Sequence, residues 1–175
     1  KIVFLNVPGH GHVNPTLALV TELVRRGHEV IYYNNSEFAP QIRQSGAEFR
    51  PYPDPQPTAV ALAEKANSLP QVSVWVLEQS QRLLPWLLAE LRREPPDLIV
   101  FDSICLWGMQ AAQLLGIPAA ASITTFVAEG VKGIFTVRDG LALVGQALTA
   151  LPGIIGKRRQ LTRTYGPAGF PRPQI

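Results

Sequence analysis

The chain has 175 residues, of which 46% are hydrophobic, so one domain with a buried core is expected. A single cysteine, Cys105, excludes a disulfide within the chain and favours a reducing compartment, which predicts a cytoplasmic protein. The net charge is +3, but the basic residues are not interleaved with aromatic residues, so nucleic-acid binding is not expected. No apolar run reaches membrane-spanning length, so no membrane span is expected either. The one local basic cluster, at 157–159 and Arg163, is interpreted as a solvated helix face.

The first predicted elements are a strand and a helix. Residues 2–5 are branched and apolar and are bounded by turn residues, which is typical of a buried parallel strand. A helix is expected over 16–26, with Asn14 as its cap and Pro15 at its first position.

The loop between these two elements is rich in glycine and histidine. Gly9 and Gly11 permit conformations and close approaches that a side chain would forbid. The N–H groups of the following helix favour an anion, and His10 or His12 would titrate near neutrality beside it. The dinucleotide-binding fingerprint is not matched, because Asn14 occupies the position of its third glycine.

Strands and helices then alternate, with the second long helix kinked or restarted at Pro85. Further strands are expected at 29–33, 47–52, 97–101 and 117–123, and helices at 36–44, 59–67, 72–93 and 106–115. This succession predicts an α/β domain with a doubly wound, mostly parallel Rossmann-like sheet and helices on both faces. Right-handed crossovers place the first four strands in the order 3-2-1-4.

Asp102 stands at the carboxyl end of the strand at 97–101. The first and fourth strands flank the point where the strand order reverses, so Asp102 and His12 are expected at one crevice. There the carboxylate would fix the imidazole tautomer and stabilise the imidazolium. The alternative is that Asp102 only caps the helix that begins near Ile104.

Two segments resemble a known family: Gly11-His12-Val13-Asn14-Pro15, and the Arg26-Gly27-His28 that ends the following helix. Together they resemble the first βα unit of the UDP-sugar-dependent glycosyltransferases of the GT-B type. Bacterial macrolide and antibiotic glycosyltransferases and their plant natural-product relatives are the most similar members. The resemblance extends more loosely over residues 1–175, which look like a single N-terminal, acceptor-binding domain, one half of a GT-B fold. Nothing in the chain corresponds to the family's C-terminal nucleotide-sugar-binding domain, so the isolated chain is expected to be inactive.

The resemblance implies an inverting sugar transfer without a metal or other cofactor. His12 would be the base and Asp102 its supporting carboxylate. The co-substrate would be UDP-glucose or a similar nucleotide sugar, with its diphosphate next to Gly11 and His12. The acceptor would be a hydrophobic, hydroxylated small molecule.

The acceptor side is expected to include His10 and the end of the strand at 117–123. Candidate acceptor-binding residues there are Thr124, Thr125 and Phe126. The apolar, weakly helical segment 127–156 is broken by glycines and Pro152, and either lines an acceptor channel or covers the core.

Two functions of other classes stay open. His10, His12 and Asp102 together form a ligand set for a metal-dependent enzyme, since alternating histidines and a carboxylate are common ligands. The second alternative is that the chain is a non-catalytic module that binds an apolar small molecule.

Overall fold

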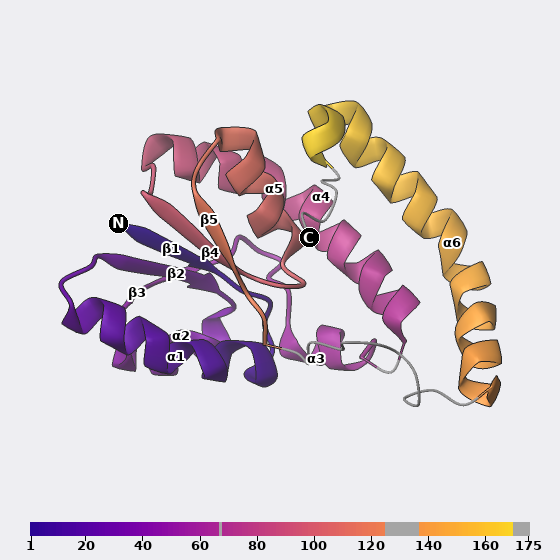
Figure 1. Ribbon diagram of the computed structural model, residues 1–175, viewed down its shortest axis with the longest axis horizontal. Helices are drawn as coiled ribbons and strands as arrows, with labels where there is room; N and C mark the ends of the chain where they lie inside the picture. Colours follow the sequence, from indigo (N-terminus) through magenta and orange to yellow (C-terminus); the bar gives the residue numbers. More distant parts are fainter. Residues whose placement is uncertain (67, 125–136, 170–175) are drawn as a thin grey trace.

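The computed structural model describes residues 1–66, 68–124 and 137–169. Its centre is one sheet of five parallel strands in the order β3-β2-β1-β4-β5 (Figure 1). The strands are β1 (Ile2–Leu5), β2 (Val30–Asn34), β3 (Glu48–Pro51), β4 (Leu98–Asp102) and β5 (Ala119–Ser122). The predicted α/β class, the parallel sheet and the order of the first four strands are confirmed.

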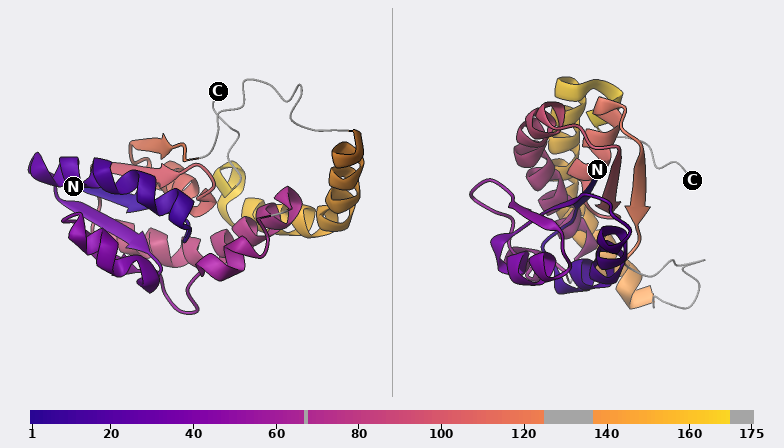
Figure 2. Two further views of the ribbon diagram at one scale, coloured as in Figure 1. Left: turned by 90° about the horizontal axis from the view of Figure 1, so that it is seen from below. Right: turned by 90° about the vertical axis from the view of Figure 1, so that its left-hand side faces the viewer.

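Helices cover both faces of this sheet, as predicted. They are α1 (His10–Arg25), η1 (Ser36–Phe38), α2 (Ala39–Gln44), α3 (Ala59–Ala63), α4 (Leu69–Arg93), α5 (Leu106–Leu115), α6 (Val137–Tyr165) and η2 (Gly166–Gly169). In Figures 1 and 2, α1 and α2 lie on one side of the sheet, and α4 and α5 lie on the other.

Alternation along the central strands builds two hydrophobic cores. Phe4 and Tyr32 face α1 and α2, where they pack with Val13 and Phe38. Leu5 belongs instead to the core under α4 and α5. Because the strands are buried on both faces, their sequences are apolar throughout, which is why the parallel sheet could be predicted.

The first helix begins earlier than expected. It starts at His10 with Gly9 as its N-cap residue, so Pro15 lies inside the helix and Asn14 is an exposed residue rather than the cap. The amides of His12 and Val13 both bond to the Gly9 carbonyl, which closes the first turn. The predicted loop histidines therefore belong to the first helical turn.

The two long helices also differ from the prediction. The fourth helix starts at Leu69, capped by Ser68, and runs through Pro85 as one element, held by the buried leucines on either side of that proline. The last helix runs through Pro152 where a break was expected, and Figure 2 shows that it bends along its length, as helices with an internal proline do. It packs along α4, where Gly153 lies next to Val74. The remainder of the expected channel segment, residues 127–136, lies outside the described residues.

Candidate active site

His12 and Asp102 meet at the carboxyl ends of β1 and β4. These strands are direct neighbours, with Leu5 paired to Phe101, so the residues that follow them share one edge of the sheet. Nδ1 of His12 lies 2.9 Å from Oδ2 of Asp102. The Asp102 side chain is fully buried, whereas 17% of the His12 side chain is exposed. The sequence reasoning thus placed both residues correctly in space.

Helix α5 begins at Leu106 with Cys105 as its N-cap residue and has no side-chain capping bond, so the alternative that Asp102 caps this helix is wrong. Asp102 instead bonds to the turn before the helix. Its Oδ1 accepts a hydrogen bond of 2.9 Å from the backbone N–H of Ile104, ahead of α5. Its Oδ2 accepts from the hydroxyl of Thr124, at 2.6 Å, in addition to contacting His12. The carboxylate is therefore fixed by the local turn while its second oxygen faces the imidazole.

This contact determines the imidazole tautomer. An ionised carboxylate only accepts hydrogen bonds, so Nδ1 of His12 must carry the proton that faces Asp102. The Thr124 hydroxyl also lies 2.9 Å from Nδ1. Nε2 of the neutral ring is then unprotonated and available to accept a proton from a ligand.

A buried polar network supports the first turn of α1, and sequence reasoning missed it. The side chain of Asn6 donates to the carbonyl of His12 (3.0 Å) and to the hydroxyl of Tyr32 (2.6 Å). The hydroxyl of Tyr52 donates to the carbonyl of Asn6 at 3.0 Å, and Nε1 of Trp107 donates to Tyr52 at 3.1 Å. A polar residue directly after the buried strand was the one signal that pointed to Asn6.

Three neighbouring groups are kept neutral by burial. Burial, and then the charge of Asp102, raise the pKa of the Cys105 thiol well above its usual value. Burial likewise raises the pKa of Tyr52 and of Tyr32. Cys105 is consequently a protonated packing residue, and the two tyrosines keep their hydroxyl protons for hydrogen bonding.

Of the other predicted site residues, Thr124 joins this contact, His10 and Gly11 form no hydrogen bond with it in the described part of the chain, and two lie outside that part. His10 is exposed, and its ring packs on Phe38 with 5.0 Å between centroids. Gly11 is exposed, and a methyl group added there would meet nothing within 4 Å, so no close approach within the chain requires this glycine. The hydroxyl of Thr124 contacts both His12 and Asp102, a pair called the dyad below, and Thr125 and Phe126 lie outside the described residues.

The proposed metal ligands do not converge. Among the residues whose side chains the structure describes, no group of three or more His, Cys, Asp or Glu side chains is arranged to hold a metal ion. His10 contacts Phe38, whereas His12 uses Nδ1 toward Asp102.

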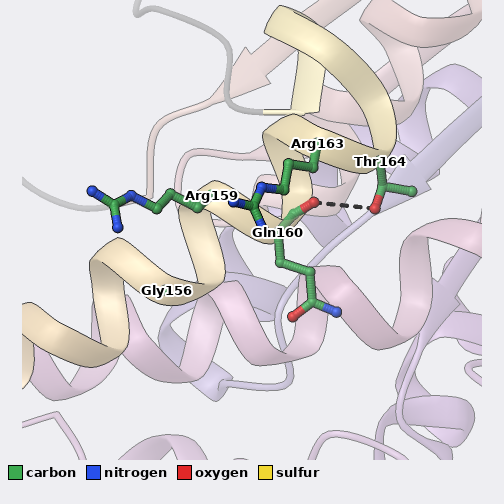
Figure 3. A pocket seen from close by; sticks show the side chains of 5 residues that line it. All are labelled: Gly156, Arg159, Gln160, Arg163 and Thr164. Atoms are coloured by element: carbon green, nitrogen blue, oxygen red, sulfur yellow. Dashed lines mark hydrogen bonds between the residues drawn. The ribbon is translucent and has the colours of Figure 1, made fainter.

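A hollow of about 560 Å³ lies along α6, away from His12 and Asp102 in sequence. It is lined by Gly156, Arg159, Gln160, Arg163 and Thr164 (Figure 3). Arg159 and Arg163 are exposed, as expected of a solvated basic face, whereas Lys157 is half-buried and pairs with Glu78 at 3.1 Å. Arg159 extends away from Gln160 and Thr164 in this view. No helix in the described part of the chain is long and apolar enough to cross a membrane.

Sequence comparisons find glycosyltransferases. The chain is 35% identical over 130 residues to the NDP-glycosyltransferase YjiC of Bacillus licheniformis. The aligned residues cover 71% of this chain and 33% of that protein. It is 29% identical over 138 residues to the demethyllactenocin mycarosyltransferase of Streptomyces fradiae, 73% of this chain and 30% of the relative. The chain thus spans about a third of the length of these curated relatives. No protein-family model matches it.

Solved structures give the same class. The glycosyltransferase of kitacinnamycin superposes with a TM-score of 0.67 at 27% identity, over 99% of this chain and 41% of that one. The calicheamicin glycosyltransferase CalG4 also gives 0.67, at 26% identity, over 96% of this chain and 42% of that one. The chain is therefore recognised as a relative of the bacterial GT-B glycosyltransferases, and its Rossmann-like sheet is one half of the GT-B fold.

Proposed function

We propose that this chain is the acceptor-binding domain of an inverting glycosyltransferase, with His12 as the general base. The observation that carries the proposal is the contact between the buried Asp102 carboxylate and Nδ1 of His12. This contact favours a neutral imidazole whose Nε2 has no hydrogen-bond partner among the described residues. The His12 side chain is also partly exposed, so a ligand can reach it. A base of this kind suits proton removal from an acceptor hydroxyl.

The proposed reaction is a single displacement. Nε2 of His12 takes the proton of the acceptor hydroxyl while the oxygen forms a bond to the anomeric carbon of the sugar. The bond from that carbon to the diphosphate oxygen breaks, and the nucleoside diphosphate leaves with the electron pair. Attack opposite the leaving group inverts the anomeric centre. Asp102 stabilises the imidazolium that forms, as a buried carboxylate does in a catalytic triad.

The donor and acceptor are inferred from chemistry and from the relatives. The name of the Bacillus licheniformis relative describes a nucleoside-diphosphate-sugar donor, and UDP-glucose or a similar sugar is the first donor to test. The diphosphate would lie beside Gly11 and His12, where the amides that open α1 favour negative charge. A hydrophobic, hydroxylated acceptor would approach His12 with contacts from His10, Thr124, Thr125 and Phe126.

The domain would act together with a nucleotide-sugar-binding domain in a cytoplasmic enzyme. Support for this division comes from the chain spanning about a third of its curated relatives. The proposed displacement uses no metal ion to hold the leaving group, and the chelator arm of the assay below tests this.

The test is a transfer assay on the complete gene product that carries this chain. Nucleotide sugars are offered with hydrophobic hydroxylated acceptors, with and without a chelator, and the anomeric configuration of the product is read by NMR. Inverted product formed at the same rate with chelator supports the proposal. Retained configuration, or activity abolished by the chelator, contradicts it.

A further inference from the structure

The side chain of Asn6 occupies a central position between β1, β2 and the first turn of α1. It is 2% exposed, and its amide nitrogen bonds both to the carbonyl of His12 and to the hydroxyl of Tyr32. An asparagine amide has two N–H donors, and both are used here. We propose that Asn6 is a positioning residue that sets the backbone of His12 so that its ring meets Asp102. This role rests on the proposed function of His12 as the base.

The hydrogen bonds around Asn6 form a chain in which each proton has one assignment. The hydroxyl of Thr16 donates to the carbonyl of Val13 at 2.7 Å. The hydroxyl of Tyr32 lies 2.8 Å from the hydroxyl oxygen of Thr16 and must therefore donate its proton to that Thr16 oxygen. The Tyr32 oxygen accepts in turn from the side-chain amide of Asn6. The carbonyls of two consecutive residues, His12 and Val13, are thus held by side chains that meet at Tyr32.

This arrangement has a consequence for the dyad. Asp102 is fixed at the end of β4 by the amide of Ile104, and β4 is paired to β1. The imidazole reaches it from a different element, the first turn of α1, whose N-cap side makes no side-chain capping bond. Asn6, which follows β1, joins that turn to the sheet. The backbone of Asn6 is held in turn, because its main-chain carbonyl accepts a hydrogen bond from the hydroxyl of Tyr52.

The test reads the imidazole directly in the chain itself. Its three histidines can be followed individually by ¹⁵N NMR, which distinguishes a neutral imidazole protonated at Nδ1 from one protonated at Nε2. In the wild-type chain we expect His12 to be protonated predominantly at Nδ1. Asn6→Leu keeps the branching and the number of heavy atoms and removes both N–H groups. We expect the Nδ1–H to Nε2–H ratio of His12 to fall about five- to tenfold, the effect of one hydrogen bond.

The matched control is Ser80→Ala. Ser80 is fully buried and its hydroxyl bonds to Gln110, joining α4 to α5 on the opposite face of the sheet from α1. Its loss should lower the melting temperature and leave the His12 tautomer ratio unchanged. If Asn6→Leu also lowers the melting temperature and leaves the His12 tautomer ratio unchanged, Asn6 is only a structural residue and the inference is overturned.

Two further results are decisive. If Asn6→Leu does not fold, Tyr32→Phe is measured instead, because it removes the hydroxyl that orients the Asn6 amide. A smaller fall in the same ratio supports the inference, and an unchanged ratio overturns it. A wild-type His12 protonated at Nε2 would contradict the proposed role of His12 as the base. A wild-type His12 protonated at Nδ1, with a ratio that Asn6→Leu leaves unchanged, would contradict only the role of Asn6.

Discussion

Oδ2 of Asp102 lies 2.9 Å from Nδ1 of His12, although the two residues are 90 positions apart in sequence. The contact follows from the sheet order, since β1 and β4 are adjacent and parallel, Asp102 is the last residue of β4, and His12 lies in the helix that follows β1. Any change that disturbs this edge of the sheet should therefore act on both residues together.

Thr124→Val tests the third member of this contact. The hydroxyl of Thr124 donates to the buried carboxylate of Asp102 at 2.6 Å, and valine keeps the shape without the donor. We expect the free energy of unfolding in urea to fall by about 1.5–3 kcal/mol, the range for a hydrogen bond to a charged group.

Thr21→Val is the control for this change, because the hydroxyl of Thr21 bonds to Leu17 on an exposed part of α1. The control should stay within about 0.5 kcal/mol of the wild type. Equal losses in the two variants would show that Thr124 contributes nothing through Asp102.

Gly108→Ala tests the packing of α5 on the sheet. A methyl group there would stand 2.7 Å from Cβ of Phe101 and 3.3 Å from Cβ of Leu5, so helix and strands must move apart. We expect a loss of about 1–3 kcal/mol in the free energy of unfolding. Gly156→Ala, in α6, meets nothing within 4 Å and should gain about 0.5–1 kcal/mol. A stable Gly108→Ala variant would show that α5 lies farther from β4 and β1.

Glu94 should make stability depend on pH. Hydrogen bonds from Arg50, and then from Lys1, lower the pKa of Glu94 to about 2 from 4.5. Because the folded-state pKa is the lower one, the stabilisation is fully present above pH 4.5 and is lost as the pH falls toward 2. The difference in melting temperature between wild type and Glu94→Gln should shrink over that interval. A constant difference would mean that the ion pairs have no net effect.

The chain alone should bind hydrophobic hydroxylated acceptors without transferring sugar. This expectation follows from the proposed division between acceptor and donor domains. Calorimetric titration with candidate acceptors measures the first part, and release of nucleoside diphosphate from nucleotide sugars measures the second. Turnover by the chain alone would show that the donor site lies within these 175 residues.

The sheet and the dyad could be predicted because both depend on local patterns. Apolar runs such as residues 2–5 identify buried parallel strands, and the crossover rule then orders them. The strand order predicts that the loop histidines and Asp102 share one edge of the sheet, whereas the choice of His12 over His10 comes from the resemblance to the glycosyltransferases. The start of α1 could not be predicted, since Pro15 is a strong local signal for a first helical position and the contacts that override it come from Asn6 and Tyr32.

The last helix illustrates a different limit. Its glycines and Pro152 predict interruption from local propensity, whereas contact with α4 maintains one helix over Val137–Tyr165. The position of Thr124 beside the dyad likewise depends on β5 pairing with β4, which brings the residues after both strands together. Sequence spacing placed Thr124 near the crevice but did not identify its partner.

A double-mutant cycle on turnover by the complete gene product tests the central claim most directly. His12→Ala should lower turnover by roughly two to four orders of magnitude, the usual contribution of a general base, and Asp102→Asn should lower it by removing tautomer control. Since Asp102 acts through His12, the double variant should be little slower than His12→Ala alone. Losses that multiply in the double variant would contradict the account, because Asp102 would then act independently of the base.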